Sequence, residues 1–235
     1  MCVNGGKDPA KPSTCGTTGG CPAAKPATPL TKSVLDGIAK CPAMSADLQK
    51  LQKDGWTVVW GAPGGGYFSN KGTKTITLDP STGTSDDNIV TMLSHEMGHA
   101  KFTPTSVTPN GRTRAEYIRD NVQSQLEDEA EATLTQIEYK DCLTKGGGPT
   151  VAMWYGKSAE YEAIAKKYPD AKDRGKARTE IANMYGDNEK PSNCPAQTYR
   201  QYYEKPCCAP ACGTGAKGYT ESLTDDQWKA AGGKI

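Results

Sequence analysis

The amino-acid sequence predicts a mainly helical α+β fold with a small antiparallel sheet, and three observations lead to that prediction. Apolar residues recur at helical spacing in two long segments, 85–102 and 113–142. Segment 73–79 alternates and is rich in β-branched residues, as strands are. All nine cysteines lie near the two ends of the chain, and none falls between residues 42 and 141. We therefore expect a cysteine-free centre flanked by cysteine-rich ends.

The chain is expected to have three parts. Residues 1–30 are rich in Gly, Pro, Lys, Thr and Ala, which predicts an extended arm. Residues 31–145 contain both long helical segments and should form the core. Residues 146–235 are expected to be helical and cysteine-rich, and to pack on the core as one domain with it.

Shorter elements are expected around the two long helices. Upstream, the pattern predicts helices over 33–39 and 45–53, a strand over 56–60 and a glycine-rich turn over 61–66. Downstream, it predicts helices over 158–167, 173–185 and 225–231. Helices therefore outnumber strands on both sides of the centre.

Composition excludes two classes of partner. The formal net charge is +1, so there is no electrostatic reason to expect a nucleic-acid partner. No apolar stretch approaches the roughly 18 residues that a bilayer-spanning helix needs. We therefore expect neither nucleic-acid binding nor a membrane span.

The cysteines predict disulfides. No two of them have the C-x-x-C spacing that would indicate a structural zinc site. Disulfides imply an oxidising compartment, and the odd count leaves at least one cysteine outside an internal pair. The first residues lack the basic region and apolar stretch of a secretory signal. We expect a protein that is secreted or delivered outside its cell, either after removal of a signal or by a route that needs none.

The two histidines carry the strongest functional signal. His95 and His99 are four residues apart, and Glu96 directly follows the first. In a helix that begins after Ser85, both imidazoles lie on one face and can bind one metal ion. Glu96 lies beside them, where it can take a proton from water on the metal. This H-E-x-x-H arrangement is typical of zinc-dependent peptidases, and it predicts one Zn²⁺ per chain.

Two histidines do not complete such a site, because a catalytic zinc usually takes three protein ligands and leaves one position for water. The chain has no third histidine, so the remaining ligand should be a carboxylate or a thiolate. The middle of the second long helix reads Glu-Asp-Glu-Ala-Glu from residue 127 to residue 131. An acidic run is usually a solvated face, but beside H-E-x-x-H it supplies the candidates Glu127, Glu129 and Glu131.

These residues resemble the glutamate-type zincin metallopeptidases, in which H-E-x-x-H is followed by E-x-x-A-[D/N] on a second helix. Glu127-x-x-Ala130-Glu131 fits that pattern, with Glu in place of Asp or Asn. The resemblance implies a zincin-like catalytic core, with Glu127 as third zinc ligand and Glu131 orienting a histidine. Glu129 is the alternative ligand. It ranks second because the positions that follow it at helical spacing are less apolar and include Gln136. The three-histidine zincins are excluded, because no further histidine follows.

The residue types then predict the chemistry. Zinc would activate water and polarise the scissile carbonyl, with Glu96 as general base. A tyrosine or arginine must stabilise the developing oxyanion, and Tyr155 is the first candidate, with Tyr117 the second. Segment 73–79 is expected to bind an extended protein or peptide substrate along its edge, as zincins of this type do.

The chain as a whole is similar to zincin domains of bacterial effectors delivered by type VI secretion and other polymorphic-toxin systems. This resemblance implies an antibacterial toxin that acts in the periplasm of a target cell. It also implies an immunity protein and a secretion-apparatus partner. Two alternatives remain open, namely a cytosolic peptidase that processes a regulator and a non-enzymatic, disulfide-stapled binding domain.

Overall fold

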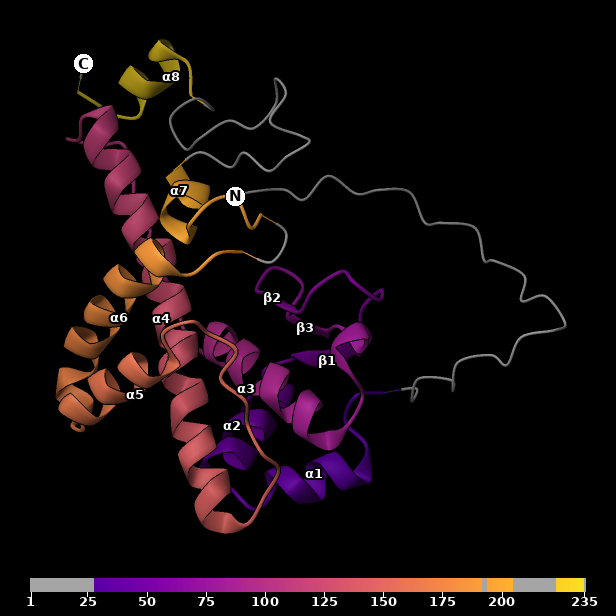
Figure 1. The fold of residues 1–235 in the computed structure, drawn as a ribbon. Coiled ribbons are helices and arrows are strands. Elements are labelled where there is room, and N and C mark those ends of the chain that lie inside the picture. The colour runs from indigo at the N-terminus through magenta and orange to yellow at the C-terminus, as the bar shows by residue number, and fades with distance from the viewer. Residues whose placement is uncertain (1–27, 192–193, 205–222, 235) are drawn as a thin grey trace, which may run out of the picture.

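The computed structural model describes residues 28–191, 194–204 and 223–234 (Figure 1). The helices in these ranges are α1 (Lys32–Ile38), α2 (Pro42–Lys53), α3 (Asp86–Lys101), α4 (Arg114–Gly146), α5 (Ser158–Lys167), α6 (Arg174–Asn188), α7 (Tyr199–Glu204) and α8 (Asp225–Ala230). The strands are β1 (Thr57–Trp60), β2 (Phe68–Asn70) and β3 (Thr75–Leu78). The prediction of a mainly helical α+β fold is confirmed.

Helix α4 runs through the middle of the molecule and has a hydrophobic core on each side (Figure 1). The first core lies between α4, the sheet and helices α1 to α3, and includes Ile38, Leu48, Ile76, Leu93, Met97 and Leu143. The second core lies between α4, α5 and α6, and includes Val122, Leu126, Ala130, Leu134, Ile164 and Ile181. The C-terminal part therefore packs on a helix that also belongs to the N-terminal core.

The sheet is mixed, which corrects the prediction of an antiparallel sheet. Its strand order is β1-β3-β2, with β1 parallel and β2 antiparallel to β3. The antiparallel partner β2 was not predicted, because three residues are too few to show a periodicity. It enters the sheet through a hairpin with β3, and the chain between β1 and β2 crosses over so that β1 and β3 run the same way. Strand β3 is consequently the central strand.

Helix α3 is buried on nearly all sides between the sheet, α1, α2 and α4 (Figure 1). The Ser85 side chain accepts a hydrogen bond from the backbone N–H of Asn88, as an N-cap should. Asp86 and Asp87 follow in the first turn, where carboxylates favour the helix dipole. The predicted start of this helix agrees with the structure.

Gly98 lets α3 and α4 approach each other closely. A Cβ atom at Gly98 would lie 2.4 Å from the Cα atom of Ala132 and 3.1 Å from the Cβ atom of Thr135. Real side chains do not tolerate the first of these distances, so the backbones can meet here only because residue 98 has no side chain. The crossing lies inside the H-E-x-x-H segment, and it brings the middle of α4 next to the two histidines.

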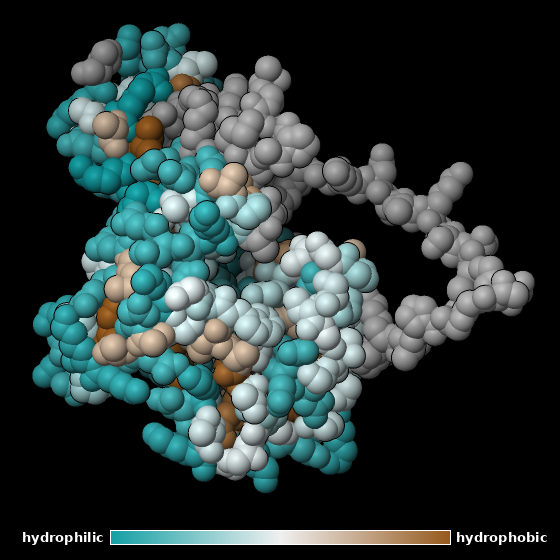
Figure 2. Space-filling view, in the orientation of Figure 1, coloured by the Kyte–Doolittle hydropathy of each residue, from teal (hydrophilic) through white to brown (hydrophobic). Residues whose placement is uncertain are grey.

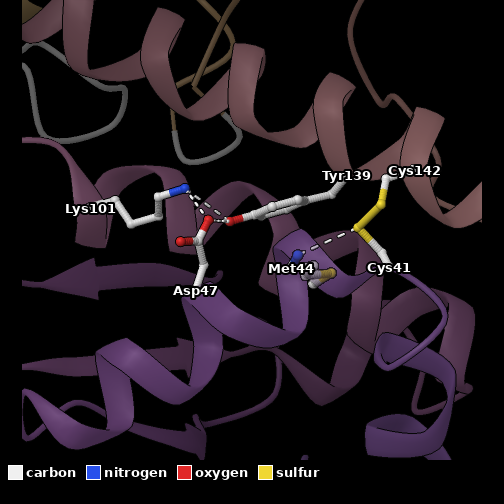
Figure 3. Close-up of a disulfide and its surroundings, with 6 residues drawn as sticks. All are labelled: Cys41, Met44, Asp47, Lys101, Tyr139 and Cys142. Carbon is white, nitrogen blue, oxygen red and sulfur yellow. Dashed lines mark hydrogen bonds and ion pairs between the residues drawn. A yellow bond between two sulfur atoms is a disulfide. The ribbon is translucent and has the colours of Figure 1, made fainter.

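One disulfide joins Cys41, at the N-cap of α2, to Cys142, near the end of α4 (Figure 3). It links the two cysteine-rich ends of the sequence across 101 residues, as the cysteine distribution predicted in general terms. Cys194 is also disulfide-bonded. The predicted arm, apart from residues 28–30, lies outside the described residues, as do the remaining cysteines: Cys2, Cys15, Cys21, Cys207, Cys208 and Cys212.

A polar contact beside this disulfide joins α2, the C-terminal end of α3, and α4. The Tyr139 hydroxyl donates a hydrogen bond to Asp47 at 2.7 Å, and Lys101 contacts both of these side chains (Figure 3). These contacts and the disulfide hold the same part of the fold together.

The surface seen in Figure 2 is mainly hydrophilic, with apolar side chains showing in strips between the helices. This agrees with the low mean hydropathy of −0.67. Within the described ranges, no helix combines the length and the apolar character that crossing a membrane requires.

Candidate metal centre

The structure brings His95, His99 and Glu129 together. The histidines lie one turn apart on α3, and their Nε2 atoms are 3.1 Å from each other. Each of these nitrogens lies 3.6 Å from Oε2 of Glu129, which projects from α4. The three side chains are only 9 to 14% exposed. They could hold a metal ion between them.

A chain of hydrogen bonds fixes the tautomer of His95. The Gln136 amide nitrogen faces the carbonyl of Ala152 at 3.0 Å, so its oxygen is the acceptor for the Tyr155 hydroxyl at 2.7 Å. Tyr155 has therefore used its one proton, and it must accept from Nδ1 of His95 at 2.8 Å. The proton of a neutral His95 is on Nδ1, which leaves the Nε2 lone pair free.

The tautomer of His99 is fixed in a second way. Its Nδ1 lies 3.2 Å from the carboxylate of Asp128, which can only accept a hydrogen bond. Asp128 is in turn paired with Lys71, in the turn between β2 and β3, at 3.0 Å. The Nε2 lone pair of a neutral His99 therefore also faces Glu129. Such a carboxylate behind a metal-binding histidine is a common orienting arrangement.

The result is three electron-pair donors that face one point. Burial disfavours a charge on His99, but the Glu129 charge and hydrogen bonds to Asp128 and Glu129 outweigh it, and they hold the pKa of His99 well above its usual value. The centre therefore attracts positive charge, which a proton or a metal ion can supply. Two imidazole nitrogens and one carboxylate oxygen suit Zn²⁺ well.

Glu96 lies beside the three donors and is not one of them. Its side chain is buried, and its Oε2 atom makes no hydrogen bond in the described part of the chain. Burial raises the pKa of Glu96, although the nearby histidines oppose that shift. The adjacent backbone is fixed by Ser69 of β2, whose hydroxyl donates to the Glu96 carbonyl at 2.7 Å. A buried carboxylate with an unused acceptor is suited to taking a proton.

Glu127 and Glu131, by contrast, face α6. Glu127 accepts a hydrogen bond from Thr179 at 3.3 Å, and Glu131 is paired with Arg174 and Arg178. The structure therefore places Glu129, not Glu127, with the histidines, and it gives Glu131 arginine partners in place of a histidine. Side chains two residues apart on a helix point in directions that differ by about 200° around its axis. Glu129 consequently lies on the opposite face of α4.

Glu127 was favoured by its fit to the E-x-x-A-[D/N] pattern and by the apolar stripe of α4. That stripe faces the second core, away from α3. The face that carries Glu129 is equally buried, although it is more polar: Ala132, Gln136 and Tyr139 are all at most 2% exposed. An apolar stripe could therefore not identify the face that meets the histidines.

The two tyrosines predicted to stabilise an oxyanion are placed differently. Tyr155 is next to the centre, but its hydroxyl proton is already donated to Gln136, so it orients His95. Tyr117 packs edge-on against Trp228 of α8, with ring centroids 5.4 Å apart, near the start of α4.

Tyr67 is a tyrosine that the sequence did not single out. Its ring lies edge-on to that of His95, with centroids 6.5 Å apart, and its hydroxyl makes no hydrogen bond within the described ranges. Burial and the nearby charges of Glu96 and Glu129 raise the pKa of Tyr67 to about 12. It therefore stays protonated at neutral pH and has a proton to donate.

A glycine turn positions Tyr67. The buried carboxylate of Asp79 accepts hydrogen bonds from the backbone N–H groups of Gly64 and Gly66, at 3.0 and 2.9 Å. Both glycines have a positive φ, of 77° and 76°, which other residues rarely adopt. The turn ends directly before Tyr67, so Asp79 fixes the approach of this tyrosine to α3.

Tyrosines from the C-terminal part complete the surroundings. Tyr185 of α6 and Tyr203 of α7 both direct their hydroxyls at the Glu129 carboxylate. The rings of Tyr199 and Tyr202 both pack against the ring of Tyr203. No short sequence pattern indicates that Tyr203 reaches Glu129 across 74 residues.

Comparisons with protein-family models, with curated proteins and with solved structures found no match. The function of this chain is therefore inferred from the geometry of the centre.

Proposed function

We propose that this protein is a zinc-dependent peptidase with a zincin-like centre. One observation carries the proposal: two imidazole nitrogens and a carboxylate oxygen face one point, beside a buried glutamate whose Oε2 atom has no hydrogen-bond partner among the described residues. A zinc ion held by His95, His99 and Glu129 would lower the pKa of bound water towards about 7 and polarise the scissile carbonyl.

The other residues around the proposed zinc site have separate catalytic and orienting roles. Glu96 takes the proton of the attacking water and passes it to the leaving amine. Tyr67 donates a hydrogen bond to the oxyanion that develops on the carbonyl. Asp128 and the Tyr155–Gln136 pair hold the two histidines in the tautomers that leave Nε2 free.

The substrate strand is best accommodated at β2. Segment 73–79 was expected to bind it, but β3 has a neighbour on each side and offers no free edge. Strand β2 is at the edge of the sheet, and its Ser69 contacts the backbone of Glu96. An extended peptide added to β2 would therefore pass next to the catalytic residues.

An oxidising site of action is part of the proposal. The Cys41–Cys142 disulfide supports it, because such bonds persist mainly outside the reducing cytosol. We propose a secreted or delivered effector that acts in the periplasm of a target cell and is neutralised by an immunity protein. Periplasmic expression should then harm a susceptible bacterium more than cytoplasmic expression, and Glu96→Gln should abolish the harm. Equal harm from wild type and Glu96→Gln would contradict this.

Metal analysis and hydrolysis together test the peptidase proposal. Wild type should contain one zinc per chain and cleave an unfolded protein substrate. Glu96→Gln should retain the zinc and lose cleavage, because Glu96 acts as base and not as ligand. Glu129→Gln should lose zinc affinity. Its matched control, Glu127→Gln, should keep both zinc binding and cleavage of the substrate.

Two results would overturn the proposal. Absence of any transition metal after purification with added zinc would favour the binding-domain alternative. Full cleavage by Glu96→Gln would remove the proposed base.

A further inference from the structure

The two oxygens of the Glu129 carboxylate have different neighbours. Oε2 faces both histidine Nε2 atoms at 3.6 Å, and the Tyr185 hydroxyl lies 3.2 Å from it. Oε1 accepts a hydrogen bond from the Tyr203 hydroxyl at 2.8 Å. A carboxylate can only accept, so both phenols are donors.

The position of the Tyr203 hydroxyl is set by ring packing. The Tyr203 ring contacts those of Tyr199 and Tyr202, with centroids 5.8 and 5.7 Å apart. Tyr199 in turn packs on Tyr185 at 4.7 Å, and its backbone N–H donates to the carbonyl of Glu189 at 3.0 Å. Helix α7 is thereby attached to α6, and Tyr203 has little freedom to turn away from Glu129.

We propose that Tyr203 is a positioning residue that makes Glu129 a one-oxygen metal ligand. The inference rests on the proposed function. The hydrogen bond would hold Oε1 away from a bound metal ion, so that only Oε2 would bind it. Without this donor, Oε1 would have no hydrogen-bond partner among the described residues, and it would turn to the cation instead. Two-oxygen binding would fill the coordination position that a catalytic zinc keeps open.

The C-terminal part of the chain contributes side chains to the candidate metal centre. Both hydroxyl donors to Glu129 come from beyond residue 146, on α6 and α7. The predicted core, residues 31–145, contains the three proposed ligands and the base. The two tyrosines that determine which oxygen of Glu129 faces the metal lie outside it.

Cobalt substitution of the full chain tests the inference. Four-coordinate Co²⁺ absorbs visible light much more strongly than five- or six-coordinate Co²⁺. Wild type loaded with one equivalent of Co²⁺ should show the strong absorption, and Tyr203→Phe should show it weakened several-fold. Affinity for Co²⁺, measured by chelator competition, should be retained or increased. Activity, measured as kcat/KM, should fall about 10- to 100-fold, the usual effect of losing such a partner.

Two matched variants separate this role from general packing. Tyr202→Phe lies on the same helix, and in the described part of the structure its hydroxyl makes no hydrogen bond to Glu129, so this variant should match wild type in absorption and in kcat/KM. Tyr185→Phe should keep the strong absorption, because Oε1 still has its Tyr203 donor. The unfolding temperature of the metal-free proteins shows that each variant is folded.

A second measurement needs no variant. X-ray absorption of wild-type protein with Zn²⁺ should show four ligands, with one carboxylate oxygen at about 2.0–2.2 Å. Two carboxylate oxygens at that distance, or a cobalt spectrum unchanged in Tyr203→Phe, would overturn the inference while leaving the peptidase proposal intact. A wild type that binds neither metal would overturn the proposed function itself.

Discussion

At the scale of single residues, helix geometry explains which ligands could be predicted from sequence. His95 and His99 had to share a face, because any helix places residues four apart side by side. The choice between Glu127 and Glu129 depended on which face of α4 meets α3. Helix α4 separates two cores and is buried on both faces, so hydrophobic periodicity could not identify that face. In the structure, Gly98 meets Ala132, which lies three residues after Glu129 on the same face of α4.

The orienting role of Asp128 gives a prediction at this scale. Replacing Asp128 with Asn keeps the size of the side chain but removes the charge that holds Nδ1–H of His99 and pairs with Lys71. Zinc affinity should fall about 10- to 100-fold, as is typical when a carboxylate behind a histidine ligand is lost. Competition with a chelator measures it. The variant Asp120→Asn, on the same helix but paired with Arg112, should bind zinc like wild type. Equal affinity in all three proteins would refute the role.

At the scale of elements, the long periodic helices were predicted close to their observed bounds, and the two shortest functional elements were missed. Strand β2 has three residues, which are too few to show a periodicity. Helix α7 has six residues, as does the predicted α8, so length alone does not explain why α7 was missed. Both elements matter to the centre, because β2 contacts Glu96 through Ser69 and α7 carries Tyr203. Their positions follow from tertiary packing, which a local pattern does not contain.

The crossing of α3 and α4 gives a prediction at the scale of elements. Gly98→Ala should push the helices apart, because its Cβ would lie 2.4 Å from the Cα of Ala132. Overpacking of this kind costs about 1–3 kcal/mol of unfolding free energy, and it should also weaken zinc binding by withdrawing Glu129. Urea unfolding and metal titration measure the two effects. Gly175→Ala in α6, where the nearest atom is 3.9 Å away, is the control and should be neutral or stabilising. An unaltered zinc affinity in Gly98→Ala would show that the crossing does not set the ligand position.

At the scale of the whole molecule, the cysteine distribution predicted that the ends of the chain are stapled, but it could not give the pairing. Cys41 and Cys142 meet because α4 returns alongside α1 and α2, which brings their Cα atoms to 5.3 Å. The loop that the disulfide closes contains the sheet, α3 and all three proposed ligands. The Cys41–Cys142 disulfide therefore closes a loop around the proposed centre, but it contributes no ligand to it.

Removal of this staple should lower stability without altering the centre. In the unfolded chain, a disulfide that closes a loop of about 100 residues removes enough entropy to stabilise the fold by about 4–5 kcal/mol. The double variant Cys41→Ser with Cys142→Ala isolates that effect, because serine can replace the Cys41 sulfur as acceptor for the backbone N–H of Met44. Urea unfolding should show the loss, whereas zinc stoichiometry of the folded variant should stay at one per chain. If the variant unfolded at the wild-type urea concentration, the disulfide would not be a source of stability. If it were folded but held no zinc, the staple would be part of the centre after all.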